Sequence, residues 1–221
     1  MTKMVNKKEI IRLLSEDSYF SCFKPTSIGF KKKDGKDWEE IELFGYPRWW
    51  DDKYEDALGI RVSFSKRFDV LHRWFEPFRA TTPQQLRDLR SHYTVGITHD
   101  MYFPEREHYY TFPFNGCEFE KRLEDMRRDI VEIGTYFFDK YKTLNDYYKN
   151  DVEPIIADEH FKFGDGYIHW YLYLKAAKLV SPEKYGQIQQ KIMEHIEYLH
   201  SWHEPNLENL YPKLEEILNA V

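Results

Sequence analysis

The sequence lacks the short motifs that mark many enzyme families. It contains no GxxxxGK[ST] phosphate-binding loop, no GxGxxG after a predicted strand, no HExxH zinc motif, no GxSxG nucleophile elbow and no EF-hand loop. These absences lower the expectation of an enzyme. They do not exclude one, because an active site can also be assembled from scattered residues.

Cysteines and long apolar runs are scarce as well. Only Cys22 and Cys117 are present, far apart in the chain and outside any CxxC pattern, which is typical of a reducing compartment. No run of about 18 apolar residues occurs, and the first residues lack the apolar stretch of a secretory signal. We therefore expect a cytoplasmic protein that does not enter a membrane, and we predict no metal or other cofactor.

Basic residues are too few for a general nucleic-acid-binding protein. The 32 lysines and arginines are outnumbered by 38 acidic residues, which gives a formal net charge of −6. Phosphate contacts need clustered positive charge, so we expect no nucleic-acid partner. An acidic chain suits a basic protein partner instead, because opposite charges steer the two together.

Aromatic and other apolar residues are abundant, at 18% and 42% of a chain of 221 residues. Such a chain should fold around a bulky core, and its length suits one large domain. We expect a single domain over residues 1–221, with a sheet-containing part in residues 1–114 and a mainly helical part in residues 115–221.

The clearest strand is Ala57–Phe68. Alternate side chains of a strand point to opposite faces of the sheet. The buried face should carry Leu58, Ile60, Val62 and Phe64, and the opposite face should carry Arg61, Ser63, Ser65 and Arg67.

Four other stretches are predicted to be strands. Residues 28–33 and 38–46 flank Asp34-Gly35, a pair that favours a tight hairpin. Residues 92–98 and 108–114 are two more, joined by a predicted loop over residues 99–107. A hairpin between them could bring His99 and His108 together.

The remainder of the chain has helical periodicity. A long helix is predicted over Cys117–Tyr141, with an apolar stripe of Leu123, Met126, Ile130, Ile133, Phe137 and Tyr141. Strands come first and helices later, which favours an α+β fold. We predict an antiparallel sheet of about five strands, packed on one face by the long helix, with a helical C-terminal region.

The polar face of this sheet is the predicted binding surface. Arginine and tyrosine are enriched where proteins bind one another. The predicted binding residues are Arg61, Ser63, Ser65, Arg67 and Tyr109.

Three histidine groupings are candidate metal or acid–base sites, each with a structural alternative. The first is Glu197 with His200 and His203, one helical turn apart, although histidine is also favoured at a helix C-terminus. The second is His92, His99, Asp100 and His108, which could be ordinary strand and loop residues. The third is Asp158-Glu159-His160, whose adjacent side chains converge only if the backbone turns sharply.

The order of elements resembles a loose group of uncharacterised bacterial cytosolic proteins. The resemblance is carried by Gly29-Phe30-Lys31-Lys32, the strand Leu58–Phe68, the segment Asp69–Phe78 and the helix end Thr135–Tyr141. It covers about the first two-thirds of the chain. Some proteins similar to this group lie beside bacterial toxin genes and are thought to be immunity proteins. The resemblance implies a similar role and assigns no catalytic residue.

Three functions follow from these observations as hypotheses. The first is a non-enzymatic protein-binding module, immunity- or inhibitor-like, with a basic toxin as the partner. The second is a metal-dependent or hydrolytic enzyme that uses the scattered histidines and carboxylates. The third is a small-ligand site lined by Trp49, Trp50 and Tyr102.

Overall fold

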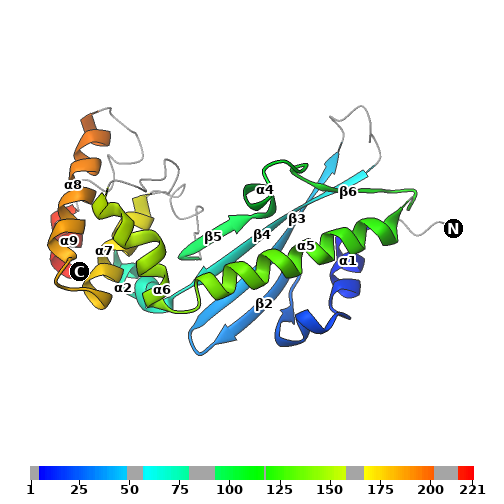
Figure 1. The fold of residues 1–221 in the computed structure, drawn as a ribbon, viewed down its shortest axis with the longest axis horizontal. Helices are drawn as coiled ribbons and strands as arrows, with labels where there is room; N and C mark the ends of the chain where they lie inside the picture. Colours follow the sequence, from blue (N-terminus) through cyan, green and yellow to red (C-terminus); the bar gives the residue numbers. More distant parts are fainter. Residues whose placement is uncertain (1–4, 49–56, 80–92, 117, 158–166, 202–213) are drawn as a thin grey trace. The chain divides into compact units, whose positions relative to one another are not determined.

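The computed structural model describes residues 5–48, 57–79, 93–116, 118–157, 167–201 and 214–221. The chain divides into two compact units. Figure 1 labels the helices and strands. Unit 1 is Met1–Lys66 with Val95–Asp139, and unit 2 is Arg67–Thr94 with Lys140–Val221. Both units therefore combine segments that are far apart in the sequence. The single domain stays a prediction.

The predicted α+β fold is confirmed. Unit 1 is built on a six-stranded sheet in the order β1-β2-β3-β4-β5, with β6 also paired to β4, and every register found is antiparallel. The strands are β1 (Lys24–Pro25), β2 (Gly29–Asp34), β3 (Asp37–Arg48), β4 (Ala57–Arg67), β5 (Val95–Thr98) and β6 (Tyr110–Pro113).

The hairpin between β2 and β3 forms where the Asp-Gly pair predicted it. Asp34 lies opposite Asp37, which leaves a loop of Gly35 and Lys36. Gly35 has φ +59°, a conformation that glycine adopts without a steric penalty.

Along one edge of β4, pairing is divided between two short strands with a gap between them. β5 pairs with Ser63–Lys66, and β6 pairs with Ala57–Ile60 along the same edge. The expected hairpin between these two strands is therefore wrong, because each pairs with a different part of β4. Residues 99–109 lie between them, and they include the short helix α4 (His99–Tyr102) where a loop was predicted.

The long helix α5 (Phe119–Lys140) covers the apolar face of the sheet, as predicted (Figure 1). A Cβ added at Gly134 would lie 3.4 Å from the ring of Phe64, and the rings of Phe64 and Phe138 lie 6.5 Å apart. Ile60, Val62 and Phe64 are fully buried. Burial of this apolar area stabilises the fold by roughly 25 cal/mol per Å².

The N-terminal segment completes unit 1. The sequence predicts Asn6 as a possible helix cap. In the structure Asn6 accepts a hydrogen bond from the Glu9 amide at 3.1 Å and caps α1 (Lys7–Leu14). A 3₁₀ helix, η1 (Ser18–Cys22), follows and stacks Phe20 against Phe30 of β2.

Within the described residues of unit 2, the regular elements are helices apart from the end of β4. Its core includes a stacked pair, Phe75 and Tyr171, with ring centroids 5.5 Å apart. The sequence predicts Thr143 as a helix cap, and in the structure it forms a capping box with Asp146. The elements are α2 (Asp69–Arg79), α6 (Leu144–Tyr147), η2 (Tyr148–Val152), η3 (Glu153–Ala157), α7 (Tyr167–Val180), α8 (Tyr185–Ser201) and α9 (Leu214–Ala220).

One helix of unit 2 continues past a proline. The sequence predicts that the helix beginning near Asp69 stops at Pro77, but α2 continues to Arg79. Proline has a helical φ but lacks the N–H group that would bond the carbonyl four residues before it, and α2 ends two residues after Pro77. The sequence also predicts a helix start at Thr82 and a last helix from Leu207. Thr82, the first residues of that last helix and Cys117 lie outside the described residues.

A buried ion network holds one end of the sheet of unit 1. Glu39 accepts hydrogen bonds from Lys66 at 2.8 Å and from Lys32 at 2.9 Å, and the Lys66 side chain is 3% exposed. Burial raises the pKa of Glu39, but the two lysines outweigh it and hold the pKa below its ordinary value. The network thus stabilises the folded state at neutral pH.

Replacing Gly29 by alanine should destabilise unit 1 by at least about 2 kcal/mol. A Cβ at Gly29 would lie 2.0 Å from the Ile41 carbonyl oxygen, a backbone atom that cannot move aside. In the matched variant Gly35→Ala the added Cβ meets nothing within 4 Å, so only the backbone conformation is penalised, by about 1 kcal/mol. Urea unfolding checks this difference, and equal losses in the two variants would contradict it.

Glu39→Gln should lower the free energy of unfolding by about 3 kcal/mol at pH 7. The folded pKa of Glu39 is depressed, so its contribution is present above the unfolded pKa and is lost as the pH falls through the folded value. Urea titrations at several pH values should show the variant and the original protein converging in acid. Glu124→Gln, which changes an exposed pair with Arg127, should lose less than about 0.5 kcal/mol at any pH.

Candidate functional site

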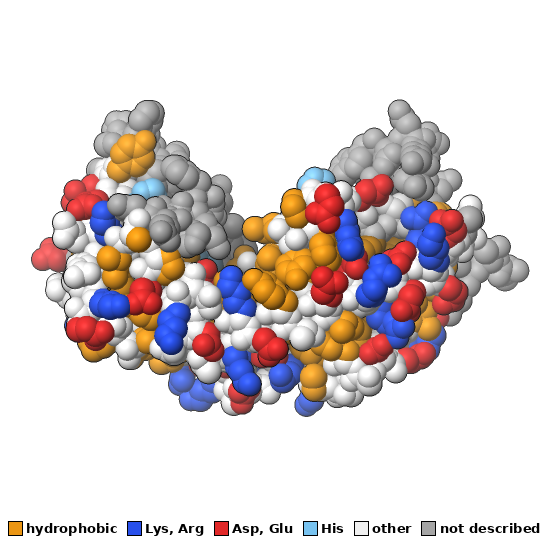
Figure 2. All heavy atoms as spheres, in the orientation of Figure 1, with side chains coloured by type: hydrophobic (Ala, Val, Ile, Leu, Met, Phe, Trp, Pro, Cys, Tyr) orange, Lys and Arg blue, Asp and Glu red, His pale blue; other side chains and the backbone are white. Residues whose placement is uncertain are grey.

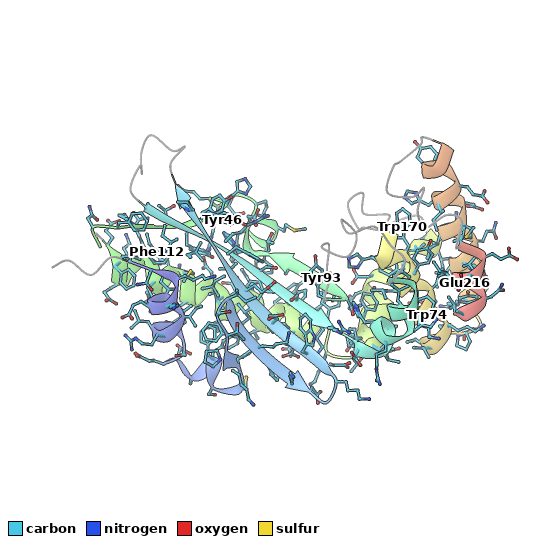
Figure 3. The ribbon with its side chains drawn as sticks, turned by 180° about the vertical axis from the view of Figure 1, so that it is seen from behind. Tyr46, Trp74, Tyr93, Phe112, Trp170 and Glu216 are labelled. Carbon is cyan, nitrogen blue, oxygen red and sulfur yellow. The ribbon has the colours of Figure 1, made fainter. Side chains whose placement is uncertain are left out.

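The sheet of unit 1 has a face opposite α5 that carries polar and aromatic side chains. Figure 3 shows this face toward the viewer, with Tyr46 labelled and α5 behind the sheet. Ile60 lies opposite Tyr110 on the α5 side, so alternation places Arg61 and Ser63 on the opposite face. The interruption between β5 and β6 lies beside them.

Arg61 is held in a charged cluster at this interruption. It donates to both carboxylate oxygens of Asp100, at 3.1 and 2.9 Å, and His108 Nδ1 donates to Asp100 at 2.9 Å. Burial raises the pKa of Asp100, but hydrogen bonds from Arg61, Thr98 and His108 outweigh it and hold the pKa well below its ordinary value. Asp100 therefore stays charged and fixes the position of Arg61.

The structure separates the five predicted binding residues. Arg61 and Ser63 lie on the open face, and the ring of Tyr109 packs edge-on against Tyr46 with centroids 5.7 Å apart. Ser65 is only 1% exposed. Arg67 belongs to unit 2, where it pairs with Asp69 at 3.1 Å. Whether any of them binds a partner stays a prediction.

A row on β3 adds residues that the sequence did not single out. Glu42, Phe44 and Tyr46 alternate onto the same face, and Phe44 and Tyr46 are 38% and 40% exposed. Glu42 is half-buried and has no hydrogen-bond or ion-pair partner in the part of the chain that the structure describes. Burial and the neighbouring charge of Glu40 raise the pKa of Glu42, against the weaker effects of Lys31 and Lys7.

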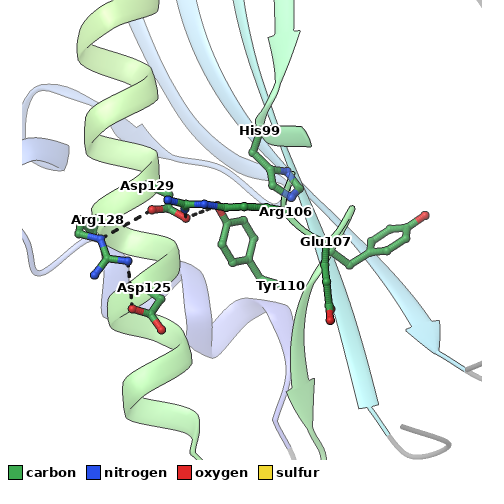
Figure 4. Close-up of a pocket in the computed structure, with 8 residues that line it drawn as sticks. His99, Arg106, Glu107, Tyr110, Asp125, Arg128 and Asp129 are labelled. Atoms are coloured by element: carbon green, nitrogen blue, oxygen red, sulfur yellow. Dashed lines mark hydrogen bonds and ion pairs between the residues drawn. The ribbon is translucent and has the colours of Figure 1, made fainter. Parts of the chain in front are cut away.

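A cavity of about 300 Å³ lies on the α5 side of the same interruption (Figure 4). His99 of α4, Tyr110 of β6 and the connecting residues Arg106, Glu107 and Tyr109 line one side of it. The rings of His99 and Tyr110 lie against each other, with centroids 4.6 Å apart. The cavity exists because residues 99–109 leave the sheet plane instead of continuing the strand.

Helix α5 supplies the other side of the cavity. Asp129 is buried and accepts hydrogen bonds from Arg106 and, at 2.9 Å, from the Tyr110 hydroxyl. Burial and the charge of Asp129 raise the pKa of Tyr110 well above its ordinary value, so this phenol remains protonated. Asp125 and Arg128 form a more exposed pair at 3.1 Å.

A separate apolar patch lies over α4 and the middle of α5, as Figure 2 shows. Met101 is 65% exposed and Tyr136 is 48% exposed. The ring of Tyr102 contacts the rings of Phe103 and Tyr136, at 4.7 and 5.3 Å. Tyr102 was expected near Trp49 and Trp50, which lie outside the described residues.

The histidine groupings are only partly described. His108 lies against Asp100, but His99 turns to the backbone of Val62 instead of toward His108, and His92 is outside the described residues. His203, Asp158, Glu159 and His160 also lie outside them, as does the side chain of His200. Within the described ranges, no group of three or more histidine, cysteine, aspartate or glutamate side chains could hold a metal ion.

No protein-family model, curated protein or solved structure matches this chain. The resemblance to uncharacterised bacterial proteins therefore stays a prediction. Among the helices that the structure describes, none is both long and apolar enough to cross a membrane.

Asp129→Asn should destabilise unit 1 by about 1–3 kcal/mol, because Asp129 is buried and its charge accepts hydrogen bonds from Arg106 and from the Tyr110 hydroxyl. The matched variant Asp125→Asn alters a half-exposed pair with Arg128 and should cost less than about 0.5 kcal/mol. Chemical denaturation followed by tryptophan fluorescence measures both. A loss at Asp129 no larger than that at Asp125 would contradict the buried pairing.

Proposed function

We propose that this protein is a non-enzymatic binding module for a basic protein, and that unit 1 makes the contact through the open face of its sheet. The observation that carries the proposal is Glu42, a half-buried carboxylate without a partner among the described residues, placed beside exposed Phe44 and Tyr46. A lysine or arginine from a partner would supply the missing countercharge.

The physical chemistry of this row favours binding over stability. A carboxylate whose pKa is raised is less stable when charged in the folded protein than in the unfolded chain. The adjacent aromatic rings can bury apolar area and can stack on a guanidinium. The net charge of −6 adds long-range attraction for a basic partner.

The predicted binding residues Arg61, Ser63 and Tyr109 border the same face. Arg61 is already neutralised by Asp100, so it would position Asp100 and His108 rather than repel a basic partner. Tyr109 extends the aromatic row through its contact with Tyr46. The immunity-like role implied by the resemblance is one form of this function, and a basic toxin is one such partner.

Glu42→Gln should weaken binding of the partner and stabilise the folded state of the free protein. The folded pKa of Glu42 is raised, so its charged form destabilises the fold as the pH rises through the unfolded and then the folded value. The variant should therefore have a higher melting temperature at pH 7, and the gain should vanish in acid. Its affinity for the partner should fall by about tenfold, the loss of one charged contact.

The partner can be identified by a photo-crosslinking amino acid at Phe44, with Tyr136 on the separate apolar patch as the comparison site. We expect crosslinking from Phe44 to one basic protein, whose affinity measured with purified components falls with added salt. Glu16→Gln removes the same charge from an exposed residue paired with Arg12 and should leave affinity unchanged. Crosslinking only from Tyr136, or a partner indifferent to Glu42→Gln, would overturn the proposal.

A further inference from the structure

The cavity beside the interrupted strand contains two buried polar atoms that lack hydrogen-bond partners. They are His99 Nε2 and Asp129 Oδ1, and each belongs to a side chain at least nine-tenths buried. A buried polar atom without a partner costs about 1–3 kcal/mol. Two such atoms in one cavity indicate that something other than the described chain satisfies them.

The contact with β4 indicates which ring nitrogen of His99 carries the proton. The Val62 amide can only donate, and it lies 3.2 Å from His99 Nδ1. The Val62 carbonyl oxygen also lies 3.4 Å from Nδ1. The shorter contact has Nδ1 accepting from the amide, which places the ring proton on Nε2 in the neutral form. Burial lowers the pKa of His99, against the effects of the Val62 and Glu107 backbone and of Asp100. His99 thus presents a hydrogen-bond donor, from the position shown in Figure 4.

Asp129 presents the complementary acceptor. Its Oδ2 atom is occupied by Arg106 and Tyr110. Arg128 Nε lies 3.7 Å from Oδ1, beyond hydrogen-bond distance. The cavity therefore offers one donor and one acceptor on two of its walls.

The charges around the cavity are of both signs, so they do not select a simple ion. Three carboxylates and two guanidiniums line it, which leaves a formal charge of −1 with His99 neutral. An anion would meet this net negative charge. A cation would meet Arg106, Arg128 and the His99 Nε2 proton.

We propose that this cavity binds a small neutral molecule with an amide group, such as a carboxamide or the amide edge of a nucleobase. An amide carbonyl accepts from His99 Nε2, and its N–H group donates to Asp129 Oδ1. The cavity volume lies at the small end of the range for ligand sites, which suits one ring. Tyr110 provides an aromatic wall. This site does not depend on the proposed protein partner.

The test is a titration of purified, full-length protein with nicotinamide and with uracil, followed by amide and histidine-ring NMR. Acetate and methylamine are the charged comparison probes. We expect saturable shifts at residues 99–110 and at His99 Nε2 with one or both amides, and none with the ions. Nicotinamide alone would identify a carboxamide ligand, and uracil alone a nucleobase.

Two variants separate the site from the general surface. His99→Phe should reduce amide affinity by at least about tenfold, and Glu124→Gln, at an exposed residue of α5 outside the cavity lining, should leave it unchanged. If His99→Phe does not fold, the ring NMR of the original protein still decides, because the proposal requires the Nε2–H tautomer and a shift of Nε2 on binding. No saturable shift at millimolar amide, equal binding of acetate, or an Nδ1–H tautomer would overturn it and would leave water as the occupant.

Discussion

The architecture of unit 1 depends on one burial, that of the apolar row of β4 beneath α5. Ile60, Val62 and Phe64 are fully buried, and the ring of Phe64 packs against the ring of Phe138 on α5. Because a strand alternates its side chains, burying this row fixes which residues face away from the helix. The open face, with Arg61 and the aromatic row of β3, is therefore a consequence of core packing.

The second determinant is the interruption between β5 and β6. A continuous strand would have paired with Arg61 and Val62 and filled the space beside α5. Residues 99–109 instead form α4 and a loop, which places Asp100 on one side of the sheet and His99 on the other. The charged cluster on the open face and the cavity on the helix side thus share one origin. His99 replaces a backbone partner of β4 with a side chain.

The sequence predicts the features that depend on neighbouring residues. The alternation of β4, the Asp34-Gly35 hairpin, the apolar stripe of α5 and the cap at Thr143 are all local patterns. The cavity is not predictable in this way, because Asp129 and Arg106 are 23 residues apart and meet only when the sheet and helix pack. Glu42 could not be singled out from the sequence, because its importance comes from its half-buried carboxylate having no side-chain partner among the described residues. That β5 and β6 pair with different parts of one edge of β4 cannot be predicted from the sequence of either strand alone.

At Val62 a hydrogen bond to the His99 side chain takes the place of strand pairing. This part of the sheet edge therefore depends on a side chain that can take up a proton. A protonated Nδ1 can no longer accept from the Val62 amide and would instead donate to the Val62 carbonyl oxygen, which lies 3.4 Å away. The lowered pKa of His99 delays this event as acid is added but does not remove it. The protection of the Val62 amide from hydrogen exchange, measured relative to the intrinsic rate at each pH, would therefore fall in acid before global unfolding. A single imidazole links the local opening of this sheet to the acidity of its surroundings.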